Sequence, residues 1–189
     1  MTKGKLIVVS APSGCGKSTI INNILDTKDF DLAFSVSATN RPPRAGEEDG
    51  VHYHFLSTER FRDAVANGEF VEWEEVYPGR YYGTLRSEID LQLTKGHNVI
   101  LDIDVKGAVN VKKLYGDDCI TIFIAPPSIE VLAQRLRSRG TDPEEVISTR
   151  LARAEYELGF ADKFDTRVIN DVLPEAVAET AGIIEAFIA

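Results

Sequence analysis

An eight-residue motif near the amino terminus constrains the fold of this chain more than any other feature. Residues 11–18 read Ala-Pro-Ser-Gly-Cys-Gly-Lys-Ser and follow the apolar run 5–10, which has the length of a buried strand. The two glycines permit the backbone angles that turn N–H groups toward phosphate oxygens, while the lysine and serine can reach terminal phosphates and Mg²⁺. Ala11 replaces the first glycine of the usual pattern. The sequence predicts a strand, a loop that binds a nucleoside triphosphate, and a helix over about 17–25.

The composition indicates one acidic globular domain. A chain of 189 residues that is 43% hydrophobic can bury a sizeable core. Its net charge of -9 disfavours nonspecific binding to nucleic acid or to an anionic membrane. The apolar runs are strand-sized and no signal peptide opens the sequence, so we expect a cytoplasmic protein. No obligatory protein partner is implied.

Strand-like and helix-like segments alternate along most of the chain, which predicts an α/β fold with a parallel sheet. The expected core strands are 5–10, 34–37, 98–103, 119–124 and 167–170. Ser128 is expected to cap a helix that runs to about Ser138, and Thr141 or Asp142 to cap the next.

Two segments interrupt this alternation. Residues 38–86 contain short strand-like pieces and one expected helix over about 58–66. Residues 134–150 carry arginines around a Gly-Thr-Asp-Pro break. We expect small subdomains attached to the α/β core at these positions.

Cysteine and histidine offer weaker signals. Cys119 begins an apolar run and is expected in the core, whereas Cys15 is expected to fill the loop, although a helix N-terminus can lower a thiol pKa. His52 and His54 have the spacing of metal ligands, but no third ligand is evident, so we expect no zinc site.

The interrupting segments carry motifs in a characteristic order. Their sequences are Thr39-Asn-Arg-Pro-Pro-Arg-Ala-Gly-Glu47, Gly50-Val-His-Tyr53, Phe70-Val-Glu-Trp73, Tyr81-Tyr-Gly-Thr84 and, further on, Leu101-Asp-Ile-Asp104. With these motifs the chain resembles the guanylate kinase family over nearly its whole length. Ala11, Asn40 and Thr84 depart from the usual pattern without removing a charge.

The resemblance implies a three-layer core with a P-loop, covering about 1–37, 87–133 and 151–189. It also implies a mixed α+β GMP-binding subdomain over 38–86 and a mobile helical lid over 134–150. The expected reaction is reversible, Mg²⁺-dependent phosphoryl transfer from ATP to GMP or dGMP, giving ADP and GDP, in purine nucleotide metabolism and GMP recycling.

Four residues are candidates for holding the phosphate of GMP. Arg41 and Arg44 lie three apart on a proline-stiffened loop, so their guanidinium groups can converge on one dianion. The hydroxyls of Tyr53 and Tyr82 can complete the shell. The resemblance implies the same use of these positions.

Glu72 is the candidate reader of the base. Guanine presents its N1–H and N2–H donors side by side, and one carboxylate accepts both. By resemblance Ser37, Thr84 and Asp104 also face the base. On composition alone, Glu72 with its neighbours Glu74 and Glu75 reads as a solvated acidic edge, and only the ordered motifs favour the functional interpretation.

Asp102 and Ser18 are the candidate Mg²⁺ residues. Asp102 stands near the carboxyl end of a central strand, where ligands of open α/β sheets gather, and it resembles the Walker B acid. Because Asp102 and Asp104 share one face of a strand, a salt-bridged structural pair remains an alternative.

Basic residues are the candidates for stabilising charge during transfer. By resemblance Arg135, Arg139 and Arg150 fold over the ATP phosphates, whereas Arg137 and Arg153 are expected to be surface or structural residues. Asn170 is expected near the adenine, with a turn as the competing explanation. The expected catalytic residues are Lys17, Arg41, Arg135, Arg139 and Arg150. The expected ATP-binding residues are Ala11, Pro12, Ser13, Gly14, Cys15, Gly16, Lys17, Ser18, Thr19, Arg135, Arg139 and Asn170.

Two other functions stay open from the sequence. A ribose bisphosphate kinase of similar fold would not need Glu72 for a guanine. A scaffold-type guanylate kinase homology domain would bind peptides, but such domains have lost phosphate-loop residues, and Lys17 and Ser18 are intact here.

Overall fold

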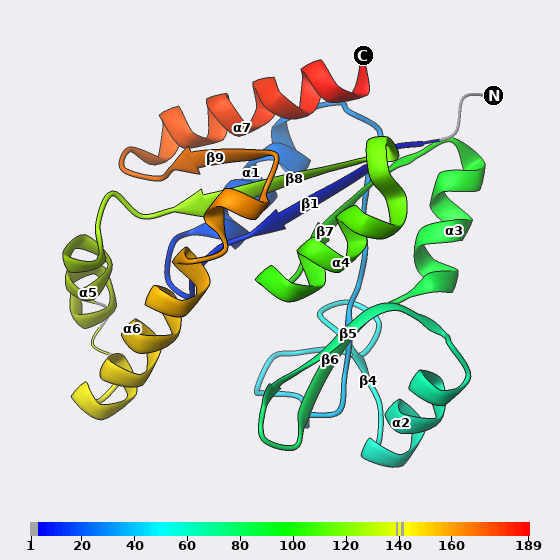
Figure 1. The fold of residues 1–189 in the computed structure, drawn as a ribbon, viewed down its shortest axis with the longest axis horizontal. Coiled ribbons are helices and arrows are strands. Elements are labelled where there is room, and N and C mark those ends of the chain that lie inside the picture. The colour runs from blue at the N-terminus through cyan, green and yellow to red at the C-terminus, as the bar shows by residue number, and fades with distance from the viewer. Residues whose placement is uncertain (1–3, 139, 141) are drawn as a thin grey trace.

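The core of the molecule is a five-stranded parallel sheet (Figure 1). The computed structural model describes residues 4–138, 140 and 142–189. In spatial order the strands are β2(Leu32–Phe34), β7(Asn98–Asp102), β1(Leu6–Ser10), β8(Cys119–Ala125) and β9(Thr166–Ile169). Strand β1 is paired on both edges, with Leu6 opposite Val99 on one side and Cys119 on the other. The strand before the phosphate loop is therefore the centre of the sheet.

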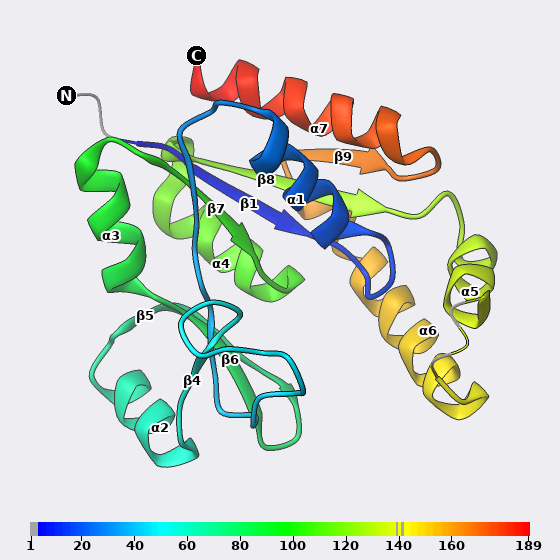
Figure 2. The ribbon, with the colours of Figure 1, turned by 180° about the vertical axis from the view of Figure 1, so that it is seen from behind.

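Helices cover both faces of this sheet (Figures 1 and 2). On one face lie α1(Lys17–Thr27) and α7(Leu173–Ile188), and on the other lie α3(Arg86–Lys95) and α4(Val105–Tyr115). Ile7 packs in the cluster with α1 and α7, whereas Leu6 packs in the cluster with α3 and α4. Successive side chains of a strand point to opposite faces of the sheet, so an unbroken apolar run allows both faces to be buried beneath helices. The predicted three-layer α/β core is confirmed.

Residues 38–85 build a second, mixed sheet below the first in Figure 1. Its strands, in spatial order, are β4(His54–Phe55), β3(Ala38–Thr39), β6(Arg80–Leu85) and β5(Phe70–Tyr77), and helix α2(Thr58–Ala66) packs on it. Strands β3 and β4 are parallel, and the other two pairings are antiparallel. The Phe61 ring of α2 stacks at 4.5 Å on Phe70 and at 5.6 Å on Tyr81. This sheet therefore has a small core of its own.

Two helices that pack against each other, α5(Ile129–Ser138) and α6(Glu144–Leu158), lie beyond the carboxyl ends of β8 and β9. Ser128 accepts a hydrogen bond from the Val131 amide at 3.2 Å, as its predicted capping role requires. The predicted cap of α6 is wrong for Asp142, because Pro143 is the N-cap and the Asp142 carboxylate accepts from Arg150 at 2.6 Å. Thr141 lies outside the described residues. The 3₁₀ turns η1(Gly116–Asp118) and η2(Ala161–Lys163) complete the chain.

The strand expected at 34–37 is placed too late in the sequence. Strand β2 covers Leu32–Phe34 because its register follows β7, with Leu32 opposite Asn98 and Phe34 opposite Ile100. After the Ser35 amide donates to the Ile100 carbonyl at 3.1 Å, the chain leaves for the second sheet.

Across the described part of the chain, every helix is too short or too polar to cross a bilayer.

Candidate active site

A cavity of about 530 Å³ lies where the phosphate loop, the second sheet and α6 meet. Figure 1 shows α6 and the second sheet below the carboxyl ends of the core strands. The lining includes all of 11–19 together with Ser37, Arg41, Arg44, Tyr53, Glu72, Tyr82, Asp102, Asp104 and Arg150. The fold thus brings residues from distant parts of the sequence to one concave surface.

Two glycines give the phosphate loop its shape. Gly14 has a φ of 94° and Gly16 a φ of 82°, both in the left-handed region that side chains disfavour. Gly16 is the N-cap of α1, and no side chain caps that helix. The first N–H groups of α1 are therefore left for a ligand, and the helix dipole favours an anion there.

Asn170 supports the loop from behind. Its side-chain amide donates to the Cys15 carbonyl at 2.7 Å, and a Cβ on Gly16 would lie 2.6 Å from that nitrogen. Asn170 is buried and its hydrogen bond holds the loop, whereas its expected place near the adenine stays a prediction. Cys15 is also buried, in a cluster with Leu132 and Leu136, as expected for a residue that fills the loop.

Lys17, Ser18 and Asp102 form the polar centre of the cavity. The Lys17 ammonium donates to Asp102 Oδ1, and Ser18 Oγ lies 3.5 Å from Asp102 Oδ2. Burial lowers the pKa of Lys17 to about 8, against the opposing effect of Glu157 and Asp104. A hydroxyl and a carboxylate oxygen side by side form a donor set that suits Mg²⁺.

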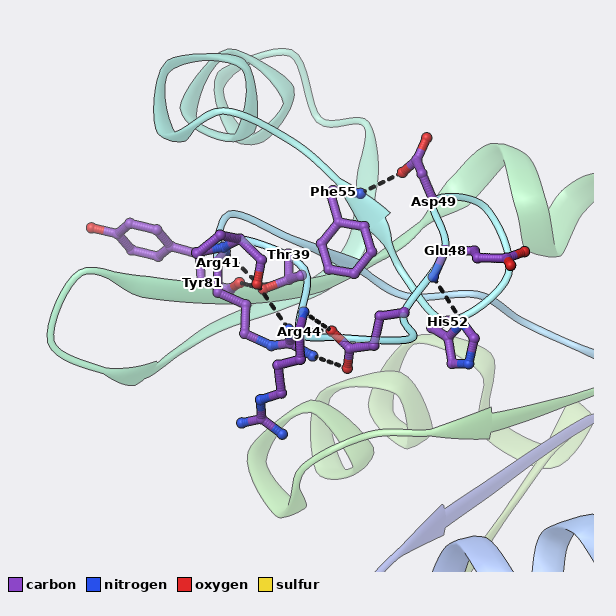
Figure 3. A network of polar contacts seen from close by, with 10 residues as sticks. Thr39, Arg41, Arg44, Glu48, Asp49, His52, Phe55 and Tyr81 are labelled. Atoms are coloured by element: carbon purple, nitrogen blue, oxygen red, sulfur yellow. Dashed lines mark hydrogen bonds and ion pairs between the residues drawn. The ribbon is translucent and has the colours of Figure 1, made fainter.

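Arg41, in the cavity lining, belongs to a network of polar contacts (Figure 3). It is 6% exposed, and its guanidinium donates to both oxygens of Glu47 at 2.6 and 2.7 Å. Glu47 also accepts from the Arg44 amide at 2.7 Å, and the Arg41 guanidinium lies 4.9 Å from the Tyr53 ring centroid. The hydrogen bonds from Arg41 lower the pKa of Glu47 to about 2. Sequence reasoning missed Glu47, although its place at the end of the Arg41–Arg44 motif is the signal that identifies it.

Glu72 is a buried carboxyl group, so a solvated acidic edge is the wrong interpretation for it. It is 6% exposed and accepts a hydrogen bond from the Thr84 hydroxyl at 2.5 Å. Burial raises the pKa of Glu72 to about 8, and the negative charges of Asp104 and Glu74 add to the effect. Thr84 itself is fully buried behind Glu72, outside the cavity lining.

The first turn of α4 makes room for Glu72. A Cβ on Gly107 would lie 2.5 Å from Glu72 Oε2, so only glycine leaves the space that the carboxyl group occupies. Asp104 caps this helix by accepting from the Lys106 amide at 2.8 Å and the Gly107 amide at 3.3 Å. Neither role was anticipated from the sequence. The space at Gly107 depends on where α4 meets β5, whereas the cap is a local signal, an aspartate directly before a helix, from which it could have been predicted.

Arg135 lines a second cavity, of about 270 Å³, with Asn170 and part of the phosphate loop. Its guanidinium donates to the carbonyls of Asn170 at 2.7 Å and Asp171 at 3.1 Å. Arg139 lies outside the described residues. Arg150 lines the first cavity, and its guanidinium donates a hydrogen bond to the Asp142 carboxylate. Arg137 is exposed and forms an ion pair with Glu144.

The remaining singled-out residues have local partners. His52 accepts from the Glu48 amide at 3.0 Å, and His54 Nε2 lies 3.6 Å from Glu88. Among the described residues, no three or more potential metal ligands cluster in space. Cys119 is buried, and burial raises the pKa of its thiol to about 12.

A phosphate loop at the edge of a parallel sheet, with arginines facing it across a cavity, defines a P-loop kinase of a phosphorylated small molecule. Comparison with known proteins gives the family. The guanylate kinase family model matches residues 3–187. A guanylate kinase of Bacteroides thetaiotaomicron is 56% identical over 185 residues, which are 98% of this chain and 90% of that protein.

A guanylate kinase of Porphyromonas gingivalis is 51% identical, covering 98% of each chain. The crystal structure of guanylate kinase from Anaplasma phagocytophilum matches with a TM-score of 0.80 and 30% identity, over 100% of this chain and 88% of that one. The chain belongs to the guanylate kinase family. The resemblance stated from the sequence is thereby confirmed.

A prediction follows from the space at Gly107. Gly107→Ala should displace the Glu72 carboxyl group and raise the KM for GMP by about tenfold, since a hydrogen bond to a charged group contributes about 1.5–3 kcal/mol. Steady-state kinetics with GMP varied will measure this. The matched control is Gly182→Ala in α7, where a Cβ meets nothing within 4 Å. Equal KM values in the two variants would contradict the role given to Gly107.

Proposed function

We propose that the first cavity is the place where this ATP:GMP phosphotransferase carries out its reaction, with ATP on the phosphate loop and GMP on the second sheet. The observation that supports this most strongly is that one cavity is lined by residues of both parts. Its lining contains Lys17 of the phosphate loop and, on the wall formed by the second sheet and its loops, Arg41, Arg44, Tyr53 and Glu72. Donor and acceptor groups therefore face each other within a single hollow.

Arg41 and Arg44 bind the GMP phosphate in this proposal. Glu47 accepts from two N–H groups of the Arg41 guanidinium and the Pro42 carbonyl accepts from a third, which leaves the remaining N–H groups for a ligand oxygen. Tyr53 and Tyr82, whose rings meet edge to face with centroids 5.9 Å apart, bring their hydroxyls to the same wall. An arginine already held in place loses little freedom on binding.

Glu72 reads the guanine base by accepting its N1–H and N2–H groups. Ser37 and Asp104 line the same cavity, and the Thr84 hydroxyl donates a hydrogen bond to the Glu72 carboxyl group. Adenine has no pair of adjacent donors at these positions, so a carboxylate here selects guanine.

The phosphate loop and its lysine hold the donor. Backbone N–H groups around Gly14 and Gly16 take the phosphates of ATP, Lys17 follows the γ-phosphoryl group, and Arg150 with Arg135 and Arg139 offsets its charge. Ser18 and Asp102 would hold Mg²⁺, which neutralises negative charge on the phosphates when it is bound.

The acceptor needs no general base, because an oxygen of the GMP phosphate is already ionised. That oxygen forms the new bond to the γ-phosphorus while the bond from the β–γ bridging oxygen breaks, and the electron pair leaves with ADP. Alignment and charge stabilisation therefore carry the catalysis.

The division of the chain follows from these roles. Residues 38–86 are the GMP-binding subdomain, 134–150 the lid, and the rest the core that holds ATP.

GMP and dGMP are both acceptors in this proposal. The protein works in the cytoplasm without an obligatory protein partner, nucleic acid or membrane.

Glu72→Gln tests the reading of the base. The amide keeps the size of the side chain but sets a donor against the donors of guanine, so kcat/KM for GMP should fall about 10- to 100-fold. The KM for ATP should hardly change, and AMP should gain relative to GMP. Glu75→Gln, at an exposed carboxyl group of the same strand, is the control. Equal losses for GMP and AMP would show that Glu72 supports the fold instead.

The pKa of Glu72 predicts a pH dependence. Only the ionised carboxyl group accepts both guanine donors, and with a pKa of about 8 the free protein holds it mainly protonated at neutral pH. The KM for GMP should therefore fall by up to about tenfold per pH unit as pH rises toward 8, then level off. Calorimetry in buffers of different ionisation enthalpy should show proton release on GMP binding.

The Glu72→Gln variant should lose this pH dependence. A pH profile for GMP that is the same in both proteins would assign the dependence to another group.

The raised pKa of Glu72 also affects stability. Since this pKa in the folded protein lies above the ordinary 4.5, the group lowers the free energy of unfolding of the free protein as pH rises from about 4.5 to about 8.

Lys17→Met tests the donor side. Removing the ammonium should lower kcat by at least about 10²- to 10³-fold, the usual loss for one preorganised donor, while GMP still binds. Lys28→Met, at the other end of α1, is the matched control. Near-normal turnover of Lys17→Met would refute the assignment of the loop.

A further inference from the structure

One side chain of α6 reaches across to the second sheet. The Arg153 Nε donates to Glu157 Oε1 on its own helix at 2.9 Å, and a second guanidinium nitrogen donates to the Val76 carbonyl of β5 at 2.8 Å. The same guanidinium lies 5.0 Å from the ring centroid of Tyr77. Arg153 therefore contacts both walls at once and is more than a surface residue.

This contact lies at the edge of the first cavity. Val76, Tyr77 and Glu157 all belong to its lining. The Arg153 side chain is 27% exposed, so water weakens its hydrogen bonds only in part. Glu157 is 5% exposed and accepts from the Nε of the same guanidinium.

Arg150 links this contact to the phosphates. It precedes Arg153 by three residues on α6, and side chains three apart on a helix are neighbours on one face. Arg150 lines the same cavity as the phosphate loop. Because both arginines belong to one helix, the hydrogen bond from Arg153 to Val76 also restricts how far Arg150 can move from the second sheet.

We propose that Arg153 is a positioning residue that ties α6 to the β5–β6 hairpin and thereby sets the separation between Arg150 and the bound acceptor. The role in catalysis rests on the proposed assignment of the cavity to ATP and GMP, whereas the tie itself does not. Arginine suits the task because its planar group donates in two directions at once, to Glu157 and to Val76, which the single ammonium of lysine does less well.

The tie is tested without substrate. Arg80→Cys and Glu155→Cys place spin labels on two exposed positions, one on the hairpin and one on α6, while the native cysteines are buried. In this background and without nucleotide, Arg153→Gln should lengthen the mean distance between the labels and broaden the distance distribution measured by double electron–electron resonance spectroscopy. An unchanged distance distribution would overturn the proposal, whatever the reaction is.

Kinetics test the positioning role. Arg153→Gln should raise the KM for GMP about tenfold and lower kcat, as expected for a lost hydrogen bond from a charged donor, and Arg153→Lys should restore part of both. Arg137→Gln, whose guanidinium pairs only with Glu144 among the described residues, is the control that should match the native enzyme. A lower Tm with unchanged KM and kcat would make Arg153 merely structural and overturn the proposal. Broader label distances with native kinetics would overturn it equally.

Discussion

Burial of β1 on both faces is the constraint from which the rest of the structure follows. Its side chains alternate between two helical layers, so a slip by one residue would exchange the two sets and disrupt the packing of both layers. The register then places Val9 opposite Asp102, at the point where the chain enters the phosphate loop. The proximity of Lys17, Ser18 and Asp102 is therefore a result of core packing.

The parts of the fold that could be predicted are those that local sequence determines. The apolar runs of β1, β7 and β8 and the serine before α5 act through their own side chains and backbone, so the sequence alone locates them. Strand β2 was misplaced because its limits come from pairing with β7. The cap of α6 was missed because Arg150 takes the Asp142 carboxylate.

The candidate site divides in the same way. Motif order predicts residues such as Arg41 and Glu72, which carry their chemistry in their own side chains and which the structure places in the cavity lining, whereas Thr84 is buried outside it. What the sequence could not give is how those groups are held: the space at Gly107 and the bond from Arg153 to Val76 exist only where separate elements meet. The contacts that hold a site in place arise from tertiary packing, whereas its reactive groups can be recognised from the residue types in the sequence.

The hydrogen bond from Asn170 to the Cys15 carbonyl joins residues 155 positions apart. During synthesis the loop therefore emerges long before the side chain that holds it, and before β9, which closes the sheet edge beside β8. A ribosome-bound chain shorter than 170 residues lacks this hydrogen bond, so its loop is not yet held in place. The braced form of the loop is in this way tied to near-completion of the polypeptide.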